Sequence, residues 1–169
     1  MQDEKLDSYD DLLKEMEKCR INKEYGKMSE VYAQIDTIIY GNDELTGNIK
    51  IESKTFFAPL LKNNLIRIPH EAIKELNIAE SGLLTVVAIR YPDIITVNIF
   101  KKPLYDFNDD EDMFGFKPLW KYDIKIENGC IKLKDYIVND MNIKPYDTIQ
   151  IEFLSGIMCI RAYQTLMLY

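Results

Sequence analysis

The chain has 169 residues, of which 47% are hydrophobic and 29% are charged, and its formal net charge is -7. This composition is typical of a folded globular domain and excludes a wholly disordered chain. No run of about 18 apolar residues predicts a membrane span, and the acidic start Met1-Gln2-Asp3-Glu4 lacks the basic and then apolar character of a secretory signal. We therefore expect a cytoplasmic protein without a membrane partner.

The acidic residues are concentrated at the start of the chain. Residues 1–45 hold six basic and twelve acidic side chains, whereas residues 46–100 hold six and five, and residues 121–169 hold six of each. An acidic first segment disfavours indiscriminate binding of nucleic acid, but nearly neutral later segments allow a local basic face.

Residues 5–40 have the apolar spacing of helices within a first segment that we place at 1–45. A break near Ile21-Asn22-Lys23 would give a helical hairpin, and continuity through Gly26 would give one long helix; the sequence is compatible with both. The apolar stripes require cover, from each other, from the rest of the chain or from a second chain in a homo-oligomer. The side chains that we predict to bind such a partner are Leu6, Leu13, Met16, Met28 and Ile35.

The remainder of the chain, residues 46–169, contains an internal repeat. Residues 54–100 align with residues 119–163, with Asn64 placed over Gly129 and Ile66 over the identical Ile131. The alignment then continues without a gap as far as Leu154, and apolar positions coincide throughout. We call this constant alignment the repeat register.

Each copy has the pattern of a strand, a two-residue turn, a strand, a short helix and a second hairpin. The turns are Asn63-Asn64 and Asn128-Gly129, the helices are 72–76 and 137–141, and the second hairpins are 83–100 and 148–163.

Two further segments flank the second copy. Residues 101–118 contain two prolines and the run Asp109-Asp110-Glu111-Asp112, which predicts an exposed acidic linker. Residues 164–169 end in Leu-Met-Leu-Tyr, and we expect this apolar tail to dock on protein.

The segment Asn64 to Val86 resembles the core motif of the AbrB/SpoVT-type transcriptional regulators and the related MazE-like antitoxins. The first copy has the Ile68-Pro69 step followed by a short helix, and the second has Lys144-Pro145-Tyr146-Asp147 before an alternating strand. The resemblance covers both copies of the repeat and leaves the first segment unassigned. It implies an α+β fold, in which the helical segment precedes two tandem repeats that form one pseudo-dimeric swapped-hairpin β-barrel, and it implies DNA binding.

The family's first hairpin usually has a glycine followed by an arginine that faces DNA. This chain has Asn64-Leu65 and Gly129-Cys130 at those places, so that arginine is not carried over. Phosphate contacts need only positioned positive charge, and nearby basic side chains are candidates for them, or else they form the solvated faces of strands. These candidates are Lys54, Lys62, Arg67, Lys121, Lys125, Lys132 and Lys134.

No residue pattern indicates catalysis, a metal site or a cofactor. His70 is the only histidine, and Cys19, Cys130 and Cys159 lack close-paired metal or redox spacing. The sequence also lacks a phosphate-cradling glycine loop and a nucleophile elbow. We therefore expect a non-enzyme.

Two functional hypotheses remain open. The first is a DNA-binding transcriptional regulator, with the barrel as the DNA platform and the N-terminal helices serving oligomerisation or partner sensing. The second is an antitoxin-like or adaptor module without DNA binding, whose acidic first segment binds a basic protein.

Overall fold

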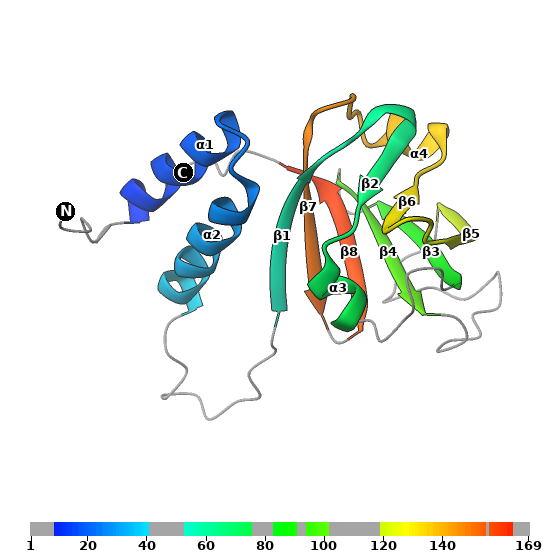
Figure 1. The fold of residues 1–169 in the computed structure, drawn as a ribbon, viewed down its shortest axis with the longest axis horizontal. Helices are drawn as coiled ribbons and strands as arrows, with labels where there is room; N and C mark the ends of the chain where they lie inside the picture. Colours follow the sequence, from blue (N-terminus) through cyan, green and yellow to red (C-terminus); the bar gives the residue numbers. More distant parts are fainter. Residues whose placement is uncertain are drawn as a thin grey trace.

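The computed structural model describes residues 9–40, 53–75, 83–90, 94–101, 119–154 and 156–163. Two helices are followed by strands that pair antiparallel, so the protein is α+β as expected (Figure 1). The expectations for Leu6, for residues 102–118 of the linker and for the tail at 164–169 lie outside these residues, and Lys101, which was expected to begin the linker at 101–118, belongs to a strand.

The first two helices form a hairpin. Helix α1 spans Tyr9–Ile21 and helix α2 spans Tyr25–Tyr40. The break occurs at Lys23, which adopts a φ of 59°, while the backbone N–H of Glu24 donates to the carbonyl of Cys19 at 2.8 Å. This left-handed residue ends α1 and reverses the chain, which decides between the hairpin and the continuous helix.

Six strands form one antiparallel sheet, in the order β1-β7-β8-β4-β3-β5. Strands from both expected repeats are interleaved in it, because β1 pairs with β7 and β5 pairs with β3. The strands are β1 (Ser53–Pro59), β3 (Leu83–Arg90), β4 (Ile95–Lys101), β5 (Trp120–Lys125), β7 (Thr148–Leu154) and β8 (Ile157–Ala162).

A short two-stranded ribbon and two short helices cover one face of the sheet. Strand β2 (Leu65–Arg67) pairs antiparallel with β6 (Cys130–Lys132), and each is followed by a helix, α3 (His70–Glu75) and α4 (Asp135–Asp140). Both helices begin slightly before the starts predicted from the sequence, directly after the residues Pro69 and Lys134.

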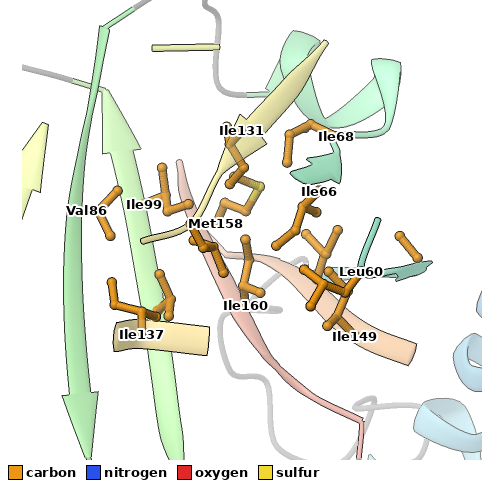
Figure 2. Close-up of a cluster of buried hydrophobic side chains, with 14 of the residues drawn as sticks. Leu60, Ile66, Ile68, Val86, Ile99, Ile131, Ile137, Ile149, Met158 and Ile160 are labelled. Carbon is orange, nitrogen blue, oxygen red and sulfur yellow. The ribbon is translucent and has the colours of Figure 1, made fainter. Parts of the chain in front are cut away.

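The core lies between the sheet and this cover. Figure 2 shows Ile66 and Ile131 of the ribbon above Met158 and Ile160 of β8; all four side chains are fully buried in one cluster. Ile68 and Leu133, which flank the ribbon, belong to the same cluster. The two expected repeats therefore share a single core.

The expected closed barrel is absent among the described strands. The sheet ends at β1 on one side and at β5 on the other, and no ladder of described residues joins these two strands. Strands β2 and β6 have three residues each and pair only with each other, so they form a separate ribbon. The result is an open sheet with a covered face.

The helical hairpin packs against the outer face of β1. Phe57 of β1 is 4% exposed and joins the cluster of α1 and α2, with its ring edge-on to Tyr32 at 5.6 Å and to Tyr163 at 5.8 Å between centroids. This cluster is separate from the core beneath the ribbon.

Candidate functional site

The β2–β6 ribbon has one buried and one outward face. Ile66 and Ile131 point into the core, and because side chains alternate along a strand, the flanking positions point outward. Arg67 lies opposite Cys130, and Lys132 lies opposite Leu65. The outward face therefore carries two exposed cations on diagonal positions.

Tight turns of the predicted kind lead into both ribbon strands. Asn63 and Asn64 have φ values of 61° and 60°, and Asn128 and Gly129 have values of 53° and 71°. Asparagine and glycine tolerate this left-handed conformation, so the positive φ values expected at these turns are confirmed. The first hairpin expected in each copy is wrong, because β1 pairs with β7 and β5 pairs with β3, while β2 and β6 pair with each other. The carbonyls of Gly129 and Asn64 accept the backbone N–H groups of Ile68 and Leu133 at 2.9 Å and 3.0 Å, which extends the pairing of the ribbon beyond its two strands.

The structure gathers four of the seven predicted phosphate-binding residues around the ribbon and leaves the others on the sheet. Arg67 and Lys132 lie on the ribbon, Lys62 in the turn before β2, and Lys134 directly after β6; all four are exposed. Lys121 and Lys125 are exposed on β5, whereas Lys54 lies on β1, the opposite edge strand. Of the seven predicted residues, only those of the ribbon and of the neighbouring strand β5 lie close enough in the fold to share one surface, and Lys54 lies apart from them.

Lys134 also packs on aromatic rings, which the sequence did not suggest. Its Nζ lies 4.3 Å from the centroid of the Tyr122 ring and 5.7 Å from that of Tyr136. Trp120 packs against Tyr136 at 4.3 Å and donates through Nε1 to a carboxylate oxygen of Asp140 at 3.1 Å. Burial raises the pKa of Tyr122 to about 12. This cluster holds Lys134 in place beside the ribbon.

Carboxylates interrupt the basic surface. Asp135 follows Lys134 and accepts a hydrogen bond from the side-chain amide of Asn64, and the exposed Glu127 lies in the turn between β5 and β6. Asp123 of β5 accepts from the Thr85 hydroxyl at 3.0 Å. The surface around the ribbon is consequently mixed in charge, with its cations concentrated on the outward ribbon face.

A cavity of about 480 Å³ opens beside the ribbon. Its apolar wall includes Ala58, Ile68 and Ile73, and its polar lining includes Arg67 and His70. Sequence reasoning missed this cavity, because the residues come from separate segments of the chain and none of them forms a motif.

The predicted partner-binding residues are internal to this chain. Met16, Met28 and Ile35 are at most 1% exposed, and Leu13 is half-buried against the same cluster. The two helices cover each other's apolar stripes together with Phe57 of β1. These residues therefore require no second chain to cover them, and they are not an available partner surface.

Other site chemistry is sparse in the residues that the structure describes. They contain no group of three or more histidine, cysteine or acidic side chains arranged to hold a metal ion. None of their helices is long and apolar enough to cross a membrane. Cys159 donates to the Oδ1 atom of Asn98 at 3.1 Å, and burial raises the pKa of its thiol to about 11.

Comparison with known proteins gives no relative: no protein-family model, curated protein or solved structure matches the chain.

Proposed function

We propose that residues 53–163 are a tandem duplication whose halves exchange strands in the manner of the AbrB-type swapped-hairpin fold, and that the chain is a DNA-binding transcriptional regulator. The fold part of this proposal is supported by strand order. If β1, β3 and β4 are equivalent to β5, β7 and β8, the order β1-β7-β8-β4-β3-β5 reads the same from either end. Such an order is expected of two halves related by a twofold axis.

The pairing within the ribbon supports the same relation. Ile66 and Ile131 are equivalent in the repeat register, and they are direct cross-strand partners. Their flanking hydrogen bonds also match: the N–H of Ile68 donates to Gly129 at 2.9 Å, and the N–H of Leu133 donates to Asn64 at 3.0 Å. Equivalent residues therefore meet on a local twofold axis.

A second pair of residues marks that axis in the sheet. Asn98 lies opposite Val87 in the β3–β4 hairpin, and Cys159 lies opposite Glu152 in the β7–β8 hairpin. The repeat register places Val87 over Glu152, so Asn98 and Cys159 occupy equivalent places. These two residues are themselves cross-strand partners between β4 and β8.

The observation that carries the functional proposal is the position of Arg67 and Lys132. They too are equivalent in the repeat register, and both are exposed on the outward ribbon face. Duplex DNA has local twofold axes that relate its two phosphate backbones, and a twofold pair of cations suits contact with both strands. Such contacts position a protein on DNA without reading its sequence, and they are sensitive to salt.

Fluorescence anisotropy at low salt, against a set of A·T-rich duplexes, tests this proposal. We expect binding that weakens as salt rises. When the logarithm of the binding constant is plotted against the logarithm of the salt concentration, the slope for the Arg67→Gln/Lys132→Gln double variant should be smaller in magnitude by about two, because each phosphate contact contributes roughly 0.9. Lys14→Gln, an exposed change on α1, is the control and should leave the slope unaltered. Absence of salt-dependent binding to every duplex would overturn the proposal.

The alternative is an interaction module whose acidic first segment binds a basic protein. The mixed charge around the ribbon, where the exposed carboxylates of Asp135 and Glu127 interrupt the basic surface, is the observation that supports this alternative. A variant with amides in place of the exposed carboxylates of Asp10, Glu24 and Glu30 distinguishes the two. It should lose protein partners in a pull-down if the module hypothesis is correct, and it should bind DNA no more weakly than the native chain if the regulator hypothesis is correct.

A further inference from the structure

The cavity beside the ribbon combines an apolar wall with a cation. Its volume of about 480 Å³ lies within the range of small-molecule sites. Ala58 of β1, Ile68 after β2 and Ile73 of α3 supply apolar wall, and all three are otherwise buried in the main core. An occupant would thus contact the same apolar surface that stabilises the fold.

Arg67 supplies the cation. This exposed residue lines the cavity, and its guanidinium makes no hydrogen bond or ion pair with any described side chain or backbone group. The exposed His70 lines the same cavity. An arginine fork recognises a carboxylate through two parallel hydrogen bonds.

The equivalent place in the other copy of the repeat shows why the cavity is open here. There, the side-chain amide of Asn64 donates to the carboxylate of Asp135, which links the turn to α4. At the cavity, Gly129 and His70 take the places of Asn64 and Asp135. A Cβ at Gly129 would meet no atom within 4 Å, so the missing side chain leaves open space.

We propose that this cavity binds a small organic acid, with an apolar body against Ala58, Ile68 and Ile73 and a carboxylate on Arg67. The charge complementarity of the arginine selects a carboxylate over an amine, and the apolar wall selects an organic acid over an inorganic anion. This site does not depend on DNA binding, and it is tested without DNA.

The probes are 3-phenylpropionate and its amide, titrated into the full-length chain while isoleucine methyl and backbone amide NMR signals are recorded. We expect saturable shifts at Ile68, Ile73 and Gly129 with the carboxylate, and binding at least about tenfold weaker with the uncharged amide. Equal affinity for both probes, or shifts confined to other parts of the chain, would overturn the proposal.

Two variants locate the site. Arg67→Gln should weaken 3-phenylpropionate binding about tenfold or more, whereas the distant Lys14→Gln should leave it unchanged. The Gly129→Asn/His70→Asp variant recreates the pair found at Asn64 and Asp135, and asparagine accepts the positive φ of this turn. It should keep a folded spectrum and lose the shifts at Ile68 and Ile73. Undiminished binding by this folded variant would place the ligand elsewhere and overturn the proposal.

Discussion

Ile66 and Ile131, which the sequence alignment places over each other, face each other across the β2–β6 ribbon, and both side chains are fully buried. Directly opposed residues in an antiparallel pair have Cβ atoms about 4.5–5.5 Å apart, so these two side chains share their packing environment. The ribbon has only three residues in each strand, and its hold on the sheet therefore depends on what these side chains bury.

A double-mutant cycle measures this relationship. Ile66→Ala and Ile131→Ala should each lower the free energy of unfolding by about 2–5 kcal/mol, because each leaves a cavity in the core. Their combined effect should differ from the sum by at least about 0.5 kcal/mol, since the two sites are in contact. Ile66→Ala combined with Ile35→Ala, in the separate helical cluster, is the control and should be additive within about 0.5 kcal/mol in urea unfolding. Additivity in both pairs would contradict the contact.

The inward and outward faces of the ribbon differ in their tolerance of charge. Leu133 is fully buried, whereas the adjacent Lys132 is exposed on the outward face. Leu133→Asp should unfold the protein, because an unpaired buried carboxylate costs several kcal/mol against a total stability of about 5–15 kcal/mol. Ile68→Asp should have the same effect. Lys132→Asp should retain a cooperative thermal melt, and a comparable melt for Leu133→Asp would show that the faces are wrongly assigned.

Local chemistry made the turns and the core faces predictable. The Asn63-Asn64 and Asn128-Gly129 steps contain residues that adopt positive φ readily, and the alternating apolar pattern places Ile68 and Leu133 inside. The break between α1 and α2 was not decided by sequence, because the residue with positive φ is Lys23, which is not a typical helix terminator.

Features that depend on several elements could not be predicted in this way. The expectation of a closed barrel was wrong, because β1 and β5 lie at opposite edges of the sheet with no ladder of described residues between them, and β2 and β6 pair only with each other. The contact of Lys134 with Tyr122 depends on how α4 and β5 approach each other. The cavity is lined by residues of β1, β2, α3 and the turn before β6, and no sequence motif relates these separate segments.

The phenol of Tyr122 makes stability sensitive to high pH. Burial raises its pKa to about 12 from the ordinary value of 10, against a smaller lowering by the backbone of Lys134, and its buried hydroxyl makes no hydrogen bond of standard geometry with the described residues. A raised pKa means that the folded protein retains this proton better than the unfolded chain. The contribution of the neutral Tyr122 phenol to the free energy of unfolding is therefore complete below pH 10, and it is lost as the pH rises from 10 to about 12.

The variant that tests this effect is Tyr122→Phe. It should be at least as stable as the native chain at pH 7, because it removes a buried hydroxyl that lacks a partner. Chemical unfolding between pH 9 and 12 should show a smaller loss of stability for this variant. Tyr146→Phe is the control, since Tyr146 is 54% exposed, and it should follow the native pH dependence. Parallel curves for the native chain and Tyr122→Phe would refute the assignment.

The three thiols should react at different rates with an alkylating reagent at pH 8. Cys130 lies on the outward ribbon face, whereas Cys19 is fully buried in the helical cluster. Burial also raises the pKa of both the Cys19 and the Cys159 thiols, and the reactive thiolate is correspondingly scarce. Mass spectrometry of the native protein should find Cys130 modified first. Denaturant should bring all three rates together, and a faster reaction at Cys159 than at Cys130 would contradict this order.

The helical hairpin should be held to the sheet chiefly through Phe57. This side chain is 4% exposed, contacts Tyr32 and Tyr163 edge-on, and belongs to the cluster that contains the buried stripes of α1 and α2. Phe57→Ala removes a buried aromatic ring at a cost of about 3–5 kcal/mol. Short helices are marginally stable in water without tertiary packing. In the Phe57→Ala variant, hydrogen exchange should therefore accelerate in residues 25–40, while the amides of β7 and β8 keep their protection from exchange.

Phe56→Ala is the matched control for that experiment. The neighbouring Phe56 points to the opposite face of β1, where its ring meets Phe153 of β7 at 6.0 Å. Removal of the Phe56 ring should accelerate hydrogen exchange in the sheet, and it should not accelerate exchange selectively in α1 and α2. If both variants release the helices equally, the hairpin and the sheet unfold as one unit. If neither variant accelerates exchange in the helices, contacts other than those of Phe57 hold the helical hairpin to the sheet, because the helical cluster would then survive without the Phe57 ring.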